Sequence, residues 1–253
     1  SHRAILSRYA LTMCGRYALS KLPADLVEEF ELSADRTRGI LPVDWNIAPT
    51  KDIYIIKGDR ELHTASWGLI APWSKDRSQA IKSQSQAINA RSETVDEKPT
   101  FRSAFRSKRC LIPASGYYEW ATELNYPNKQ PFFIHSTKVF KESNATLLFA
   151  GIYDQWIDSN GEIFESAAII TRPAVSFLEK IHNRMPTFLP ADRYADWLNP
   201  EITKVEEIRK IMEVADPAAD LAAHPVSARV NLVRNNGPEL TEPIELGEPE
   251  TLF

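Results

Sequence analysis

Residues 14–16, Cys-Gly-Arg, place a thiol beside a flexible glycine and a cation that favours the thiolate. A buried, inert cysteine is the alternative for any single Cys. Met13 stands where a translational start would, and its removal would leave Cys14 with a free α-amine. That amine, with a pKa of about 7.7–8.0, and a thiol with a pKa of about 8.5 can capture an aldehyde, first as a Schiff base and then as a closed thiazolidine ring.

Two further motifs contain acid–base groups. Residues 116–120, Gly-Tyr-Tyr-Glu-Trp, hold Glu119 among three aromatic rings, where desolvation would raise the pKa of the carboxyl group. An ordinary strand with a solvent-facing Glu is the alternative. His182 ends a predicted helix, whose dipole favours protonated imidazole, and a capping or surface histidine is the alternative. Residues 89–93, Asn-Ala-Arg-Ser-Glu, are predicted to form a loop that leads into a basic helix.

The basic helix is predicted over residues 99–109, with Phe101 and Phe105 on one face and three arginines on another. Clustered cations suit the phosphates of a nucleic-acid strand, and exposed aromatic rings stack on unpaired bases. The candidates are Arg16, Arg91, Arg102, Arg106, Arg109 and Arg184 for phosphates, and Trp67, Trp73, Tyr118 and Trp120 for bases. A solvated helix face and core tryptophans are the alternatives.

The charge balance is compatible with this interpretation. The net charge of −4 hides an asymmetry, because residues 1–110 contain 18 Lys and Arg against 13 Asp and Glu, whereas residues 111–253 contain 12 against 21. Nucleic-acid binding depends on a local positive surface more than on total charge. Such asymmetry is also common in proteins that bind no nucleic acid.

The composition limits the class of protein. The 253 residues are 43% apolar and 25% charged, which is typical of globular chains, and no apolar run approaches the roughly 20 residues that span a bilayer. No HExxH, CxxC, Walker A, GxGxxG or GxSxG motif occurs, so neither a metal nor another cofactor is expected. Two cysteines cannot form a disulfide framework, which favours a reducing compartment.

The elements that must position these groups are mostly strands. Runs rich in Ile, Val, Phe and Thr predict strands over residues 53–56, 62–70, 132–140, 146–153, 163–171 and 226–233, with a hairpin turn at 159–161. Further helices are predicted to begin at Pro23, Pro173 and Pro200. Because strands and helices do not alternate regularly, we expect an α+β fold whose mainly antiparallel core tends to a barrel, with short peripheral helices.

Residues 13–253 are predicted to form one domain, because no linker-like stretch divides them. Residues 1–12 are predicted to be an extension that is not part of the mature protein. The Glu- and Pro-rich end from residue 238 onward is expected to be loose or to lie along the surface.

Eight short motifs occur in a fixed order from Met13 to the end of the chain: residues 13–17 (MCGRY), 46–49 (NIAP), 67–70 (WGLI), 89–91 (NAR), 109–113 (RCLIP), 116–120 (GYYEW), 182–186 (HNRMP) and 226–231 (VS followed by VN). Any one of them alone would be a weak signal. Together they resemble the SOS-response-associated peptidase (SRAP) family, whose members crosslink to abasic sites in single-stranded DNA.

The resemblance implies specific roles. Cys14 would form a thiazolidine with the ring-opened abasic sugar, and Asn89 would position the cysteine and the sugar. Glu119 and His182 would be the acid–base pair that assists ring opening, proton transfer and reversal. The resemblance further implies that Arg16, Arg91 and Arg184 contact phosphates and that Trp67 and Trp120 meet the DNA.

The family name refers to the autocatalytic removal of whatever precedes the cysteine, in which the thiol attacks the preceding peptide bond. With Thr12 and Met13 attached, Cys14 has no free α-amine, and we hypothesise that the extension results from the choice of start codon. Two other classes stay open: a general cysteine peptidase that uses Cys14, His182 and Glu119 on other proteins, and a non-covalent single-stranded DNA-binding module. The expected partner is single-stranded DNA with abasic sites, met by a monomer in the cytoplasm, at the nucleoid in a bacterium.

Overall fold

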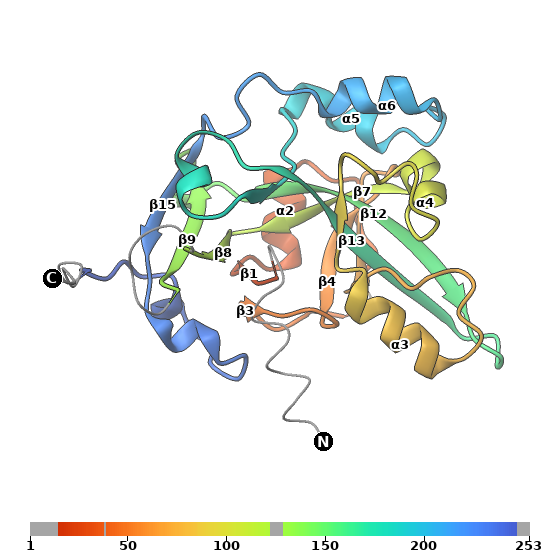
Figure 1. Ribbon diagram of the computed structural model, residues 1–253, viewed down its shortest axis with the longest axis horizontal. Helices are drawn as coiled ribbons and strands as arrows, with labels where there is room; N and C mark the ends of the chain where they lie inside the picture. Colours follow the sequence, from red (N-terminus) through yellow and green to blue (C-terminus); the bar gives the residue numbers. More distant parts are fainter. Residues whose placement is uncertain (1–14, 38, 122–128, 247–253) are drawn as a thin grey trace, which may run out of the picture.

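The computed structural model describes residues 15–37, 39–121 and 129–246 (Figure 1). Two sheets form its core. The first has the strand order β15 (Leu221–Pro225), β9 (Pro131–Ser136), β8 (Gly116–Trp120), β1 (Tyr17–Leu19) and β3 (Asp44–Ile47). The second has the order β14 (Arg184–Pro186), β13 (Ile163–Pro173), β12 (Leu147–Ile157), β7 (Arg109–Ala114), β4 (Asp52–Ile56), β5 (Glu61–Trp67) and β2 (Ala34–Asp35), and β6 (Asn89–Arg91) pairs with β13. A short hairpin joins β10 (Val139–Phe140) to β11 (Ser143–Asn144).

The second sheet closes on itself, because β13 pairs with β12 along one edge and with β5 along the other. The closing pair is parallel, with Ser166 opposite Ser66 and Ala167 opposite Trp67, whereas the other neighbours in this ring of five strands run antiparallel. The fold is therefore α+β with a mainly antiparallel barrel, as the sequence predicts. The predicted hairpin turn at 159–161 is also present, between β12 and β13.

Aromatic side chains join the two sheets. The ring of Tyr17 on β1 lies 5.2 Å from that of Trp67 and 5.8 Å from that of Phe149, which belong to the barrel. The ring of Tyr117 on β8 lies 5.9 Å from that of Phe149. These edge-on contacts are the favoured geometry for aromatic pairs and fix β1 and β8 against the barrel wall.

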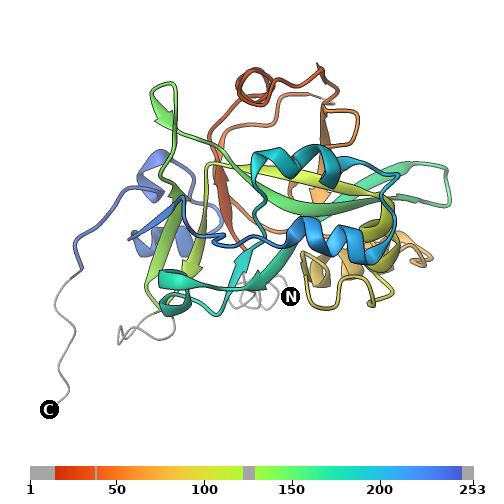
Figure 2. The same ribbon diagram turned by 90° about the horizontal axis from the view of Figure 1, so that it is seen from above.

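The helices are short and lie at the periphery. They are α2 (Pro23–Glu29), α3 (Arg77–Gln86), α4 (Arg102–Ser107), α5 (Tyr194–Leu198) and α6 (Val205–Met212), with 3-10 turns η2 (Ser176–Lys180), η3 (Ala191–Arg193), η4 (Ala228–Asn231) and η5 (Pro238–Leu240). In Figures 1 and 2, α3 and α4 lie on the side of the barrel away from the first sheet. No helix among the described residues is long and apolar enough to cross a membrane.

Two predicted elements differ in kind from the structure. Strand β13 continues through Pro173, so the helix predicted there is only the turn η2. The strand predicted over residues 226–233 is instead η4, because the Ser227 side chain accepts a hydrogen bond from the backbone of Arg229 and starts a turn. Strand β15, just before it, pairs with β9 in its place.

The basic helix is shorter than predicted, and Arg109 begins β7 rather than extending the helix. Its buried guanidinium donates to the carbonyl oxygens of Phe105 at 3.0 Å and of Trp197 at 2.7 Å. Burial lowers the pKa of Arg109 to about 10. Arg109 therefore holds the ends of α4 and α5 together and presents no charge to a nucleic acid.

Candidate functional site

The chain enters the candidate site along β1, beside β8. Cys14 lies outside the described residues, which begin at Gly15, buried like its neighbour Arg16. The backbone N–H of Tyr118 donates to the carbonyl oxygen of Arg16 at 3.0 Å. Tyr17 lies opposite Tyr117, and by the same antiparallel register Gly15 falls opposite Glu119.

Glu119 and His182 come together although 63 positions separate them. The Oε2 atom of Glu119 lies 4.0 Å from Nδ1 of His182, and the exposed fractions of the two side chains are 5% and 17%. The backbone N–H of His182 donates to Leu178 at 2.9 Å, which places the imidazole at the end of η2. A gap of 4.0 Å is longer than a hydrogen bond, but catalytic contacts are commonly looser in a free enzyme and tighten with substrate. The structure thus pairs a buried carboxyl group with a partly exposed imidazole.

The backbone of Arg184 holds the ring of His182 in place. The Nδ1 atom of His182 lies 3.1 Å from the backbone nitrogen of Arg184 and 3.4 Å from its carbonyl oxygen. The same ring nitrogen is the one that faces Oε2 of Glu119. An imidazole nitrogen can accept or donate a hydrogen bond according to its tautomer, so both Arg184 and Glu119 can orient this ring.

Asn89 is positioned by the wall of the barrel. It begins β6, which runs parallel to β13 with Asn89 opposite Ile169. The residue before it, Ile88, accepts two hydrogen bonds at its carbonyl oxygen, from the indole N–H of Trp67 and from the backbone of Ile169, both at 3.1 Å. Asn89 is half-buried and lies on a strand that pairs with β13, rather than in the loop that the sequence predicts.

Gly68 allows the chain to pack closely against α3 directly after Trp67. Its φ of +115° lies in a region that L side chains rarely adopt, and a Cβ atom would clash with the carbonyl oxygen of Gln84. The chain can therefore turn at Gly68 directly against α3 and leave Trp67 in the barrel.

Two of the aromatic rings that were predicted to contact DNA, those of Trp67 and Tyr118, are buried in the structure. Trp67 is completely buried in the principal core, where it supports the segment before Asn89. Tyr118 is also fully buried, and its hydroxyl group donates to the carbonyl oxygen of Trp45 at 2.8 Å. Neither ring is available to stack on a base. Trp120 is half-buried, with its indole N–H donating to Asn231 at 2.7 Å.

The predicted phosphate contacts fall into two groups. Arg91 on β6 and Arg102 and Arg106 on α4 are exposed. Arg16 and Arg184 are buried, with exposed fractions of 3% and 8%. Sequence alone treats these arginines alike, whereas burial separates cations that meet solvent from cations that are already enclosed by protein.

Arg184 is neutralised within the protein. Its guanidinium forms a two-fold ion pair with Glu93 and also donates to the backbone oxygen of Thr171 at 2.7 Å. The hydrogen bond from Arg184 holds the pKa of Glu93 at about 2, well below the usual 4.5. The guanidinium of Arg184 is thus already bonded to a carboxylate, and the predicted phosphate contact would require Glu93 to be displaced.

Arg16 is enclosed differently. Its Nη1 atom donates to Asn46 Oδ1 at 2.7 Å and to the carbonyl oxygen of Val230 at 2.9 Å, and its guanidinium carbon lies 6.0 Å from the ring centre of Trp120. Burial lowers the pKa of Arg16. Its partners in the described part of the chain are neutral, so its positive charge meets no carboxylate within ion-pair distance. An anion next to Arg16 would therefore be stabilised in a site of low polarity.

Three residues that support the site were not singled out as site residues in the sequence. They are Asn46, which orients Arg16, Asn231, which orients Trp120, and Glu93, which occupies Arg184. Asn46 and Asn231 lie within quoted motifs, at residues 46–49 and 226–231, so their motif membership was the available signal. Glu93 likewise lies within the quoted segment 89–93, but a carboxylate there gave no sign that it would pair with Arg184.

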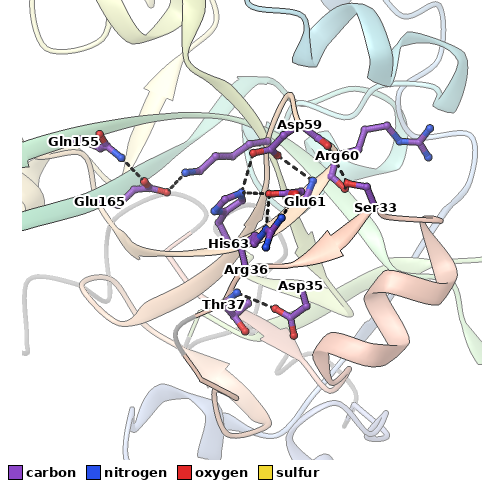
Figure 3. Close-up of polar contacts among 11 residues, drawn as sticks. Ser33, Asp35, Arg36, Thr37, Asp59, Arg60, Glu61, His63, Gln155 and Glu165 are labelled. Atoms are coloured by element: carbon purple, nitrogen blue, oxygen red, sulfur yellow. Dashed lines mark hydrogen bonds and ion pairs between the residues drawn. The ribbon is translucent and has the colours of Figure 1, made fainter.

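One cluster among the described residues has ligand atoms near enough together to be considered for a metal ion. Atoms of Asp59, Glu61 and His63 lie within 4.8 Å of one another, at the turn from β4 into β5 (Figure 3). Both carboxylate oxygens of Glu61 accept hydrogen bonds from Arg36 at 3.0 Å, and His63 is 3.1 Å from Asp59. Arg36 already neutralises Glu61, so we interpret the cluster as an ion-pair network that links β2 to β5.

Comparisons with known proteins agree with one another. A family described as SOS response associated peptidase (SRAP) matches residues 13–233. The chain is 38% identical to the abasic site processing protein YoqW of Bacillus subtilis, over 91% of this chain and 99% of that protein. It is 35% identical to the abasic site processing protein HMCES of Gallus gallus, over 76% of this chain and 60% of that protein. A crystal structure of a protein from Bacteroides thetaiotaomicron, 27% identical, superposes with a TM-score of 0.79 and covers 92% of this chain and all of that one.

Proposed function

The chain belongs to the SRAP family, and from this premise we propose that it recognises abasic sites in single-stranded DNA and crosslinks to them through Cys14. The observation that carries the proposal is the approach of Glu119 to His182, 4.0 Å apart, beside the strand that follows Cys14. A single peptide bond joins Cys14 to Gly15, which lies opposite Glu119 in the register of β1 and β8. This short covalent link supports the proposal that the nucleophile reaches the proton-transfer pair.

The proposed reaction needs two nucleophiles on one residue. The amine of a terminal Cys14 attacks the aldehyde carbon of the ring-opened sugar and forms a carbinolamine. Loss of the carbinolamine hydroxyl as water gives an iminium ion, and the thiolate adds to the same carbon to close the thiazolidine. One water leaves for each crosslink that forms.

Each step moves a proton that Glu119 and His182 can carry. Ring opening and loss of water need an acid at the sugar oxygen, while the amine and the thiol must each lose a proton before or during attack. His182 is partly exposed and can meet the substrate, and Glu119 behind it can balance the imidazolium charge. The half-buried Asn89 supplies an amide that fixes the orientation of the sugar and the cysteine.

Exposure of the Cys14 amine precedes crosslinking in this proposal. When residues precede Cys14, its thiol attacks the Met13 carbonyl, the peptide nitrogen leaves as the Cys14 amine, and water hydrolyses the resulting thioester. The same Glu119 and His182 would transfer the protons. Where residues precede Cys14, the activity on abasic DNA thus depends on a peptidase step that acts on the chain itself.

The proposed partner is a single strand that passes the exposed cations. Arg91, Arg102 and Arg106 present unburied guanidinium groups, and the enclosed charge of Arg16 attracts a phosphate next to the reacting sugar. An abasic site needs no base to be displaced, so a strand without a partner reaches the site at low cost. The chemistry needs only one copy of the chain, and its substrate places it with DNA, in the cytoplasm or at a bacterial nucleoid.

A denaturing gel tests the proposal. Protein that starts at Cys14 is incubated with single-stranded DNA that contains one abasic site, and the expected result is a slower band that survives heat and detergent. Cys14→Ser and intact DNA are the controls, and both should give no such band. The 253-residue chain, run beside them, shows whether residues 1–13 are removed before the crosslink forms.

Three results would count against the proposal. No stable band from protein that starts at Cys14 would refute crosslinking. In that case, Cys14-dependent cleavage of other proteins would favour a general peptidase. Binding that Cys14→Ser leaves unchanged, without any covalent band, would favour a non-covalent binding module.

A further inference from the structure

A polar pocket lies where β13 ends, beside segments that contain residues of the proposed reaction site. It has a volume of about 230 Å³, and its polar lining comes from Ser92, Arg172, Thr187 and Arg209, with Met212 and Glu213 from the end of α6. Ser92 directly follows β6, and its backbone N–H donates to Thr171 at 2.8 Å. The pocket therefore borders the segments that contain Asn89, Arg91 and Arg184, without including any of them.

Arg172 is the unusual cation of this pocket. It is half-buried, its Nε atom is fully buried without a hydrogen-bond partner, and no carboxylate in the described part of the chain pairs with it. Arg209, across the pocket, is by contrast paired with Asp96 at 2.5 Å. Burial lowers the pKa of Arg172, and the charge of Glu93 partly opposes that shift. A half-buried guanidinium that no carboxylate bonds directly is unfavourable in the free protein.

The side chain of Thr187 is a second, independent group in this pocket that lacks a hydrogen-bond partner among the described residues. Its exposed fraction is 1%, and its Oγ1 atom is buried without a hydrogen-bond partner among the described residues. Buried hydroxyl groups in native proteins are usually satisfied, so an exception calls for an explanation. The hydroxyl of Thr187 and the guanidinium of Arg172 can both donate, and a guanidinium can only donate. The absent partner is therefore an acceptor. Because Asp96 neutralises Arg209 and Glu213 is exposed to solvent, the unpaired charge of Arg172 is the feature that favours an anion.

We propose that this pocket binds a backbone phosphate of the DNA strand that reacts at Cys14, an inference that rests on the proposed function. A phosphate diester offers acceptor oxygens to the Arg172 fork and to the Thr187 hydroxyl at once. The pocket is several times larger than the volume of about 30 Å³ that a water occupies in the liquid, so a tetrahedral phosphate fits. Occupation would give the Arg172 guanidinium and the Thr187 hydroxyl an acceptor and fix the path of the strand beyond Arg91.

The test measures non-covalent binding of a fluorescent single-stranded oligonucleotide without an abasic site, by anisotropy over a range of salt concentrations. Arg172→Gln should weaken binding about tenfold, because it removes a charged hydrogen bond. It should also reduce the slope of log K against log salt by about 0.7, the value for one phosphate contact on a single strand. Thr187→Val should weaken binding with the slope unchanged, since it removes a donor without changing the charge.

Arg36→Gln is the matched control. It makes the same change in charge at an exposed arginine that pairs with Glu61 and does not line the pocket. Its salt slope should equal that of the wild type. Thermal melts establish that each variant is folded, and Thr187→Val should be at least as stable as wild type, because it removes a buried hydroxyl group without a partner.

The outcomes separate the possible sources of the anion. An unchanged salt slope in Arg172→Gln overturns the proposal. The proposal is also overturned if inorganic phosphate stabilises the wild type but not Arg172→Gln, while both proteins bind the strand equally well. That result would identify a site for a free anion. The crosslinking gel distinguishes the two proposals. If the wild type crosslinks and Arg172→Gln retains the salt slope of the wild type, only the phosphate-binding proposal for the pocket is refuted. If the wild type neither crosslinks nor binds the strand, both proposals are refuted.

Discussion

Glu93→Gln tests the ion pair that encloses Arg184. The hydrogen bond from Arg184 lowers the pKa of Glu93 from 4.5 to about 2. A difference of that size corresponds to at most about 3.4 kcal/mol in the free energy of unfolding. Because the Glu93 side chain is 46% exposed, solvent screening reduces this contribution. We expect the pair to contribute about 1–2 kcal/mol, and the neutral amide that replaces the carboxylate to retain only part of it.

The sign of the pH dependence follows from the lowered pKa. Above about pH 4.5 the carboxylate is ionised in both folded and unfolded chains, and the full stabilisation is present. As the pH falls from about 4.5 toward 2, the unfolded chain binds the proton first, and the stabilisation from Glu93 is lost. The gap in stability between wild type and Glu93→Gln should therefore be largest near neutral pH and shrink over that window.

Urea denaturation at a series of pH values measures this gap directly, since the acid sensitivity of all other groups is common to the two proteins. Glu162→Gln is the control, because Glu162 and Arg77 form an exposed pair 3.7 Å apart, which should contribute less than about 0.5 kcal/mol. A gap between wild type and Glu93→Gln that stays constant from pH 7 to pH 3, or no gap at pH 7, would refute the reasoning. Either result would leave Arg184 free to bind phosphate.

Three further substitutions test how the site is supported. Gly68→Ala should destabilise the fold by about 2–4 kcal/mol, because its Cβ meets Gln84 and its φ is unfavourable, and a normal urea midpoint would contradict that. Arg109→Met should destabilise the fold by about 3 kcal/mol, because it removes several buried hydrogen bonds. An unchanged midpoint in thermal melts would contradict this. Tyr118→Phe should lower the free energy of unfolding by about 1–2 kcal/mol, because it removes the hydrogen bond to Trp45. Strand binding, measured by anisotropy, should stay within twofold of the wild type. A large loss of binding would instead support the stacking role of Tyr118.

Most strands were predictable because their apolar residues face a barrel interior. Residues 53–56 and 163–171 are rich in β-branched and apolar side chains, and each falls within a strand, β4 and β13. Closure of the barrel was predictable only as a tendency. It depends on a parallel pair between β13 and β5, whose partners lie 100 positions apart, and local patterns contain no such register.

Helix α3 shows why a polar helix was missed. Its sequence, Arg77–Gln86, has no apolar stripe, and its one large apolar side chain, Ile81, is exposed. The helix is held instead by polar contacts: the Asp76 side chain caps its first turn, and the Gln84 amide donates to Ser66 at 2.6 Å. A search for hydrophobic periodicity cannot find a helix that is stabilised in this way.

The motifs of the sequence contain Glu119 and His182, which the structure brings together, but they do not predict the contacts of the arginines. A guanidinium is an equally good partner for a phosphate, a carboxylate or a carbonyl oxygen, so an Arg in a motif predicts recognition without predicting its partner. Tertiary structure makes the choice: Arg109 bonds to carbonyl oxygens, Arg184 to Glu93, and Arg16 to neutral groups that leave its charge uncompensated. A further anion would have to displace Glu93 from Arg184 or carbonyl oxygens that bond every side-chain nitrogen of Arg109, whereas the Nε atom of Arg16 has no hydrogen-bond partner among the described residues. Among these three buried arginines, Arg16 is therefore the one whose replacement should weaken binding of the strand more than it weakens the fold.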